Sequence, residues 1–250
     1  MYNLENDGRI EFANWENPLT QPFVVTQPMV NFFRKFISKG SLAIDIGANI
    51  GDTTVPMAIA AEKDGLTLAF DPNPFVFDIL RTNSNLNKEK TNIIAKQFAI
   101  TKEDGYFFYN SSEASFANGG ISETANNFHG KYVLQEKIQG INLEAFLNKD
   151  YKEWLSKISL IKVDVEGYDL EVLRSIGDLI DRFNPVVIAE CFIMAAKQYK
   201  MDMFDFFSSK GYEIFYFVDF DENTSVHKIE VAEEMNKNEN FNFYAVKKKR

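Results

Sequence analysis

Short apolar segments recur along the chain, each bounded by glycine, proline or polar residues. Segments of this length and composition predict β-strands. They lie at Leu42–Ile46, Leu66–Phe70, Ile93–Ile100, Leu160–Val165, Val186–Cys191, Glu213–Val218 and Phe241–Val246.

Apolar residues at helical spacing lie between most of these segments. The first helical pattern, Met29–Ile37, precedes Gly40, which is a typical helix stop. Strands that alternate with helices form a parallel sheet with helices on both faces, and the last two strands would pair antiparallel at one edge if a short reversal joins them. The pattern therefore predicts an α/β, doubly wound, Rossmann-like fold. The further helices are expected at Thr53–Ala61, about Pro74–Leu86, Asp169–Ile180 and Met203–Ser209.

The organisation of the chain follows from where this pattern starts and where it fails. Residues 1–27 are polar and irregular, so we expect an N-terminal extension with a cap helix over residues 1–40 and one main domain over residues 41–250. Between residues 110 and 130 the pattern gives way to Ser, Asn, Gly and Glu. A loop of this length is a substrate lid or a plain insertion, and the sequence leaves both open.

Composition narrows the class of protein. With 250 residues and 45% hydrophobic content, the chain can bury one full core. A formal net charge of −9 argues against nucleic-acid binding. The single cysteine, Cys191, allows neither an internal disulfide nor a cysteine-based zinc site. No apolar run approaches the roughly 18 residues of a membrane span, and residues 1–7 do not read as a secretion signal, so we expect a cytoplasmic protein without membrane insertion.

The first candidate site is the point where the strand Leu42–Ile46 runs into a turn with two glycines, Gly47 and Gly51. Glycines allow the backbone to bend and to approach a ligand closely. Asp45 closes the strand, and the following helix offers its N-terminus to an anionic group. Strand, glycine turn and helix in this order are typical of a nucleotide-type cofactor site.

A carboxylate follows the next strand. Asp71 lies at the carboxyl end of that strand, where ligands collect in open α/β sheets. It can accept two hydrogen bonds from the diol of a ribose, or it can be a turn or cap residue before the next helix. Because the glycine turn lies one βα unit upstream, we favour the ribose contact.

The glycine turn also bears on which cofactor is bound. A dinucleotide fingerprint needs G-x-G-x-x-G, but counting from Gly47 the later glycine positions hold Asn49 and Asp52. A pyrophosphate would lose its close backbone approach, and Asp52 would repel it. S-adenosylmethionine has no phosphates and carries a sulfonium, so Asp45 and Asp52 are compatible with it. The turn therefore favours the methyl donor over a nicotinamide dinucleotide.

A second polar cluster lies around the end of the strand Leu160–Val165. Side chains alternate along a strand, so Lys162, Asp164 and Glu166 share one side. Such groups are costly to bury unless they are paired or functional. An alcohol that receives a methyl group sheds a proton, which a carboxylate or a lysine of depressed pKa could accept, so all three are catalytic candidates. The structural alternative is a Lys162–Asp164 ion pair, with Glu166 favouring the N-terminus of the next helix.

Two further residues are candidate substrate ligands. Glu190 ends the strand Val186–Cys191, beside the polar cluster in a doubly wound sheet, and His129 lies in the polar loop. Each has a plain alternative, as a strand-end carboxylate or a loop residue. A metal site made of Asp164, Glu166 and Glu190 has no support from histidine spacing, and we predict no metal.

Four segments, in their order and spacing, resemble the FkbM family of S-adenosylmethionine-dependent methyltransferases between about Gly40 and Glu190. They are Ile44–Gly51, Phe70–Pro74, Ile141–Leu147 and, as the strongest, Leu160–Leu173. The resemblance implies a seven-stranded sheet, which we expect to be mostly parallel with an antiparallel edge strand. It also implies O-methylation of a hydroxyl on a sugar, a glycan or another small natural product.

The resemblance places the S-adenosylmethionine contacts in three groups. The methionine end would contact the glycine turn, the ribose would contact the segment after the second strand, and the adenine would lie against the segment 97–100. The residues concerned are Asp45, Gly47, Ala48, Asn49 and Gly51 for the first group, Asp71, Pro72 and Asn73 for the second, and Gln97 and Ala99 for the third. Two alternatives stay open, namely an NAD(P)-dependent oxidoreductase and a catalytically silent S-adenosylmethionine-binding subunit.

Overall fold

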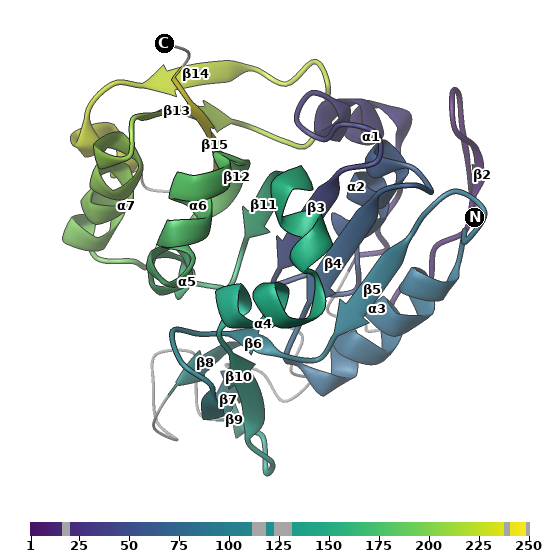
Figure 1. Cartoon of the computed structure of the whole chain (residues 1–250), viewed down its shortest axis with the longest axis horizontal. Helices are drawn as coiled ribbons and strands as arrows, with labels where there is room; N and C mark the ends of the chain where they lie inside the picture. The colour runs from purple at the N-terminus through teal and green to yellow at the C-terminus, as the bar shows by residue number, and fades with distance from the viewer. Residues whose placement is uncertain (17–20, 112–118, 123–131, 238–240, 249–250) are drawn as a thin grey trace.

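The computed structural model describes residues 1–16, 21–111, 119–122, 132–237 and 241–248. At its centre is an eight-stranded mixed sheet with the strand order β14-β13-β15-β12-β11-β3-β4-β5 (Figure 1). Neighbouring strands among β12, β11, β3, β4 and β5 run parallel, whereas β15 is antiparallel to both β12 and β13. In chain order the strands are β3 (Leu42–Ile46), β4 (Leu66–Phe70), β5 (Ile93–Lys96), β11 (Ile158–Val163), β12 (Val186–Cys191), β13 (Tyr212–Phe217), β14 (Val226–Ile229) and β15 (Phe241–Lys247).

The sheet differs from the predicted one in two respects. It has eight strands rather than seven, and although β13 and β15 pair antiparallel as predicted, β15 lies between β12 and β13, and β14 forms the edge beside β13. The hydrophobic pattern did not predict β14, because only Ile229 of its four residues is buried. The position of β15 depends on pairing between distant segments, which no local pattern encodes.

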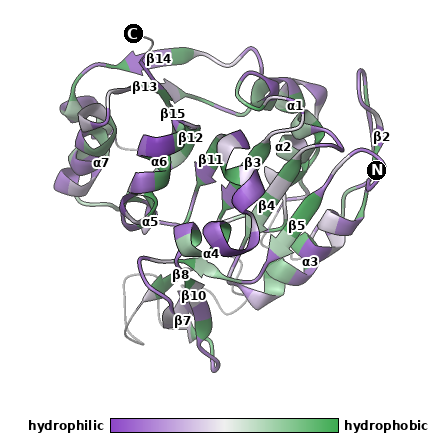
Figure 2. Ribbon diagram, viewed as in Figure 1, coloured by the Kyte–Doolittle hydropathy of each residue, from purple (hydrophilic) through white to green (hydrophobic). Residues whose placement is uncertain are grey.

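Helices cover both faces of the sheet, as predicted. In β3, Ile44 packs with residues of α5 (Asp169–Ser175) and α6 (Gly177–Phe183), whereas its neighbour Ala43 packs with residues of α1 (Gln27–Arg34) and α2 (Thr54–Ala61). This alternation buries every residue of β3. In Figure 2, β4 and β5 are coloured largely hydrophobic, as expected for strands of a covered sheet.

The remaining helices complete these two layers. The first layer includes α4 (Leu143–Asp150) and α7 (Lys197–Ser209), and the second includes α3 (Pro74–Asn85), whose Leu80 packs on Ala48 and Ala69. The short 3₁₀ helix η1 (Lys152–Lys157) connects α4 to β11, and a second one, η2 (Ala232–Met235), connects β14 to β15. The predicted helix Asp169–Ile180 is divided into α5 and α6 just before Gly177, because glycine is a poor helix former.

A second, smaller sheet lies beside the carboxyl ends of β3 and β4 and was not predicted (Figure 1). The predicted strand Ile93–Ile100 contributes to both sheets, because β5 ends at Lys96 and the chain then turns into β6. Part of the predicted loop 110–130 also belongs to this sheet, as the end of β7 and as β8, while residues 112–118 and 123–131 lie outside the described residues. Its strands are β6 (Ala99–Ile100), β7 (Gly105–Ser111), β8 (Gly120–Ser122), β9 (Tyr132–Val133) and β10 (Ile138–Ile141).

The N-terminal residues are more regular than their polar sequence predicted. They begin with a hairpin of β1 (Tyr2–Leu4) and β2 (Gly8–Ile10), and residues 11–14 then run alongside α3. The division into residues 1–40 and 41–250 stays a prediction. In the part of the chain that the structure describes, no helix has the length and apolar character that a membrane span requires.

Candidate functional site

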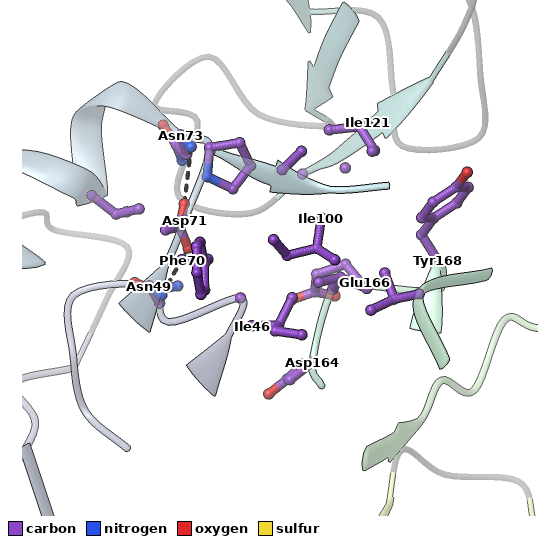
Figure 3. A pocket seen from close by; sticks show the side chains of 18 of the residues that line it. Ile46, Asn49, Phe70, Asp71, Asn73, Ile100, Ile121, Asp164, Glu166 and Tyr168 are labelled. Carbon is purple, nitrogen blue, oxygen red and sulfur yellow. Dashed lines mark hydrogen bonds between the residues drawn. The ribbon is translucent and has the colours of Figure 1, made fainter. Parts of the chain in front are cut away.

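A cavity lies at the carboxyl ends of β3, β4 and β11, between the main sheet and the second sheet (Figure 3). It encloses about 840 Å³, its open mouth included. The glycine turn, Asp71 and the end of β11, which the sequence singled out separately, all contribute to its wall.

The glycine turn reaches the cavity in a conformation that favours glycine. Gly47 has φ +78°, and a Cβ there would lie 1.7 Å from the carbonyl oxygen of Asp164. Asn49 also has a positive φ, of +47°, a region that asparagine tolerates better than most residues. Gly47 and Asn49 line the cavity, whereas Ala48 packs behind it against Ala69 and Leu80.

Asp71 fastens the glycine turn to the end of β4. Its Oδ2 accepts a hydrogen bond of 2.7 Å from the backbone N–H of Asn49, and its Oδ1 accepts one of 2.9 Å from the backbone N–H of Asn73. Burial raises the pKa of Asp71 to about 7, although the two backbone donors oppose the shift. A carboxylate has about four lone-pair positions, so two remain for hydroxyl groups of a ligand.

The residues after Asp71 form one wall of the cavity. Pro72 and Asn73 line it, and the side chain of Asn73 accepts a hydrogen bond of 3.1 Å from the backbone N–H of Phe75, which caps α3. The amide of Asn73 also donates to the hydroxyl of Tyr109 at 3.3 Å. Asn73 therefore connects the predicted ribose segment to the second sheet.

Asp45 lies behind the glycine turn and is not among the described residues that line the cavity. Its Oδ2 accepts hydrogen bonds from the hydroxyls of Thr53 and Thr54, at 2.9 and 2.6 Å, and its Oδ1 lies 3.5 Å from Nζ of Lys162. The observed contacts of Asp45 thus fix the start of α2 against β3 and β11. A contact between Asp45 and a cofactor stays a prediction.

Lys162 connects the two predicted clusters. Its side chain is 2% exposed, and its ammonium lies between Asp45 and Asp164, 3.2 Å from the Oδ2 of Asp164. Burial by itself lowers the pKa of this lysine, but Asp164, Asp45 and Asp52 together raise it above its ordinary value. Lys162 therefore stays protonated, which argues against the hypothesis of a lysine base and favours the predicted ion pair.

Glu166 lies in a tight turn between β11 and α5 and lines the cavity. It has φ +56°, and burial followed by the charge of Asp164 raises its pKa to about 7. Asp169 holds the turn, because its two carboxylate oxygens accept from the backbone N–H groups of Val165 and Gly167, at 3.1 and 3.0 Å. Sequence reasoning missed this role of Asp169. An aspartate at the start of a helix is a local signal for it, because such side chains commonly accept hydrogen bonds from nearby backbone N–H groups.

The other predicted site residues fall in several places. Ala99 lines the cavity, whereas Gln97 lies in a neighbouring groove and Gly51 packs on α3. Glu190, the residue before the last of β12, is not among the described residues that line the cavity. Burial, followed by the charges of Asp164 and Glu166, raises its pKa to about 8, and its buried Oε2 has no hydrogen-bond partner among the described residues. His129 lies outside the described residues.

Several residues of the cavity wall were missed by sequence reasoning. Most come from or border the second sheet, which the pattern did not predict, so only tertiary contacts bring them here. Tyr168 had a local signal, since it follows Glu166 and Gly167 directly. These residues are Tyr109, Ile121 and Tyr168, whereas Phe98 and Ile100, which also line the cavity, belong to the segment 97–100 that the resemblance placed against the adenine.

The electrostatics of the cavity favour a cation. Among the described residues that line it, Asp52, Asp71, Asp164 and Glu166 are acidic, and Lys162 is basic. Burial raises the pKa of Asp52 to about 6, against the opposing charge of Lys162. A positive charge of a ligand would stabilise the ionised form of each carboxylate.

The chain is similar in sequence to known methyltransferases. The family model of the methyltransferase FkbM domain matches residues 45–214. The methyltransferase sdnD of Sordaria araneosa is 30% identical over 156 residues, 54% of this chain and 60% of that protein. The hexuronic acid methyltransferase AglP of Haloferax volcanii is 28% identical over 144 residues, 58% of this chain and 53% of that protein.

Among solved structures, a methyltransferase FkbM from Methylobacillus flagellatus aligns with 86% of this chain and 50% of its own, at 11% identity and a TM-score of 0.48. The matches span 60% and 53% of the length of the two curated relatives. The family model covers more than half of the chain and includes the glycine turn, Asp71 and the end of β11. The chain therefore belongs to the FkbM methyltransferase domain family.

Proposed function

We propose that the chain is an S-adenosylmethionine-dependent O-methyltransferase that acts on a hydroxyl of a sugar, a glycan or another small natural product. The observation that carries the proposal is the acid-lined cavity in the part of the chain that matches the family model. When bound there, the cofactor would supply a methyl group on a cationic sulfur. The carboxylates of the wall suit that charge.

The wall offers a distinct environment for each part of the cofactor. Phe70, Phe98 and Ile100 provide an apolar surface for the adenine, and the free lone pairs of Asp71 suit the ribose diol. The glycine turn with Asp52 offers backbone and a carboxylate to the amino-acid end. The residues present therefore fit the group.

Glu166 is the residue we assign to the proton of the acceptor hydroxyl. Its raised pKa of about 7 lies near neutral pH, where a general base combines a large ionised fraction with sufficient basicity. Lys162 stays an ammonium and orients Asp164 through their ion pair. Glu190, at the end of the neighbouring strand, is proposed as an acceptor ligand because its buried carboxylate oxygen has no partner among the described residues.

The acceptor class rests on the relatives. AglP is a hexuronic acid methyltransferase by name, and we infer a related acceptor for this chain, which matches about half of that protein. The hydroxyl groups of a sugar would need a base such as Glu166, whereas a carboxylate acceptor is ionised already.

The nicotinamide alternative is disfavoured by a hydrogen bond. In a dinucleotide site the backbone of the glycine turn approaches the pyrophosphate closely. Here the N–H of Asn49, at the second glycine position, donates to Asp71 instead. Asp52, near the N-terminus of α2, would add repulsion between like charges.

Isothermal titration with S-adenosylhomocysteine, with NAD⁺ in parallel, tests the cofactor. We expect saturable binding of S-adenosylhomocysteine and none of NAD⁺. A failure of S-adenosylhomocysteine to bind at high concentration contradicts the proposal.

Transfer of a labelled methyl group to a panel of uronic acids, activated sugars and glycans then tests the acceptor. A methyl ether survives mild alkali, whereas release of labelled methanol would identify a carboxylate acceptor. Cofactor binding without transfer to any acceptor would favour a silent subunit.

A further inference from the structure

We propose that Asn83 is a positioning residue for the glycine turn and ties it to the N-terminal arm, which we define as residues 11–14. The proposal rests on the proposed function, since the turn contributes to the cofactor cavity. Asn83 lies within α3, is 0% exposed and is not among the described residues of the cavity wall. Asparagine is a poor helix former, so its place in a helix calls for a specific contact.

Asn83 is one of two asparagines that bind the arm in the same way. Its Oδ1 accepts from the backbone N–H of Ala13 at 2.7 Å, and its Nδ2 donates to the carbonyl oxygen of Ala13 at 2.9 Å. Asn87, just beyond α3, makes the equivalent pair of bonds with Glu11, both at 2.8 Å. Each amide thus binds one arm residue as the backbone of a neighbouring strand would.

Among the described residues, Asn83 alone of this pair donates a hydrogen bond to the glycine turn. Its Nδ2 also donates to the carbonyl oxygen of Ile50 at 2.7 Å, so the second N–H of its amide is used as well. Gly51 packs on the same part of α3, because a Cβ there would lie 3.1 Å from Leu80 and 3.7 Å from the Cβ of Asn83. The turn is therefore fixed from α3 at Ile50 and Gly51.

The opposite side of the turn is fixed at Asn49. There the backbone N–H donates to Asp71, and the side-chain Oδ1 of Asn49 accepts from the N–H of Ile50. The two residues on either side of the Ile50–Gly51 pair, Asn49 and Asp52, line the cavity. Loss of the bond from Asn83 would free this part of the turn to move, which displaces both lining residues while leaving their side chains intact.

The matched variants are Asn83→Ala and Asn87→Ala in the full chain. Each removes two bonds to the arm, and only Asn83→Ala removes the bond to Ile50. We expect Asn83→Ala to bind S-adenosylhomocysteine about tenfold or more weakly, and Asn87→Ala to bind it within about twofold of the unsubstituted chain. Hydrogen–deuterium exchange of residues 47–52 should be faster in Asn83→Ala alone, a readout that needs no ligand.

Equal binding and equal exchange in the two variants would overturn the proposal, as would unchanged binding by a folded Asn83→Ala variant. If Asn83→Ala does not fold, Asn83→Asp replaces it in the comparison, because it keeps the size and the acceptor for the N–H of Ala13 but removes the amide donor to the carbonyl oxygens of Ala13 and Ile50. The exchange readout separates this proposal from the proposed function. If the unsubstituted chain fails to bind S-adenosylhomocysteine, the function is wrong, and faster exchange of the turn in Asn83→Ala alone would still support the positioning role.

Discussion

Gly47 and Asp164 lie so close together that a Cβ on residue 47 would come within 1.7 Å of the carbonyl oxygen of Asp164. The contact joins the two motifs that the sequence singled out, which are more than a hundred residues apart. It arises because β3 and β11 are parallel neighbours, with Ile46 paired to Val163, so that their carboxyl ends meet. The backbone N–H of Asp164 also donates to the carbonyl oxygen of Ile46 at 3.0 Å.

This contact predicts that Gly47→Ala is strongly disruptive. The alanine combines an unfavourable positive φ of +78° with a backbone collision that neither strand can relieve without moving. We expect a loss of about 3 kcal/mol or more in the free energy of unfolding, at the upper end of single-residue effects, and no measurable binding of S-adenosylhomocysteine. Urea unfolding and calorimetry measure the two effects.

Gly211→Ala is the matched control. Gly211 has a similar φ, +71°, but a Cβ there would meet no heavy atom of the described residues within 4 Å. It should cost only the backbone strain, about 1 kcal/mol, and leave binding unchanged. An equal loss in the free energy of unfolding for Gly47→Ala and Gly211→Ala would show that the collision with the carbonyl oxygen of Asp164 is not the main cause.

Asp71→Asn tests the proposed ribose anchor. Both oxygens of Asp71 accept backbone N–H groups, so an amide would set its own donor against Asn49 or Asn73. We expect at least about tenfold weaker binding of S-adenosylhomocysteine by titration calorimetry. The control is Asp78→Asn. Asp78 is an exposed aspartate on α3 that pairs with Arg81, so this variant should bind S-adenosylhomocysteine as the unsubstituted chain does.

Glu166→Gln tests the assigned base. The pKa of about 7 predicts that kcat/KM of the unsubstituted chain rises with pH through about 7, because the ionised carboxylate is the active form. The variant should lose about 10²–10⁴-fold in rate, together with this acidic limb, while still binding S-adenosylhomocysteine. A retained limb in the variant would assign the titration to another group.

Stability should fall as the pH rises from about 4 to about 8. Burial raises the pKa of Asp169 from 3.8 to about 8, so the folded chain binds more protons at this position than the unfolded chain within that window. Its contribution is fully present below pH 3.8 and is lost as the pH approaches 8, with a slope of at most about 1.4 kcal/mol per pH unit. Urea unfolding at several pH values measures the slope.

Asp169→Asn removes this titration and should make the slope shallower, at the cost of one backbone hydrogen bond to the turn. Asp205→Asn, which replaces an exposed aspartate on α7, is the control and should keep the slope. A slope that is identical in both variants would assign the pH dependence to the other buried carboxyls, such as Asp71 and Glu190.

The sequence by itself determined the α/β class, most of the strands and the residue types of the site. Buried strands such as Leu42–Ile46 read as continuous apolar runs because both faces of the sheet are covered. The glycine turn and Asp71 were identified because positive φ and a carboxylate at a strand end are local requirements. Such features depend on a few neighbouring residues, so a single sequence reveals them.

Only the tertiary structure decided which strands pair and which side chains lie next to one another. The place of β15 between β12 and β13, and the second sheet that brings Tyr109 to the cavity, come from pairing between segments far apart in the chain. The protonated state of Lys162 depends on Asp45 and Asp164 approaching it from two strands, which outweighs the burial that would lower its pKa. Electrostatic and packing interactions depend on the distance between groups in the folded structure. The separation of two residues along the chain does not give that distance.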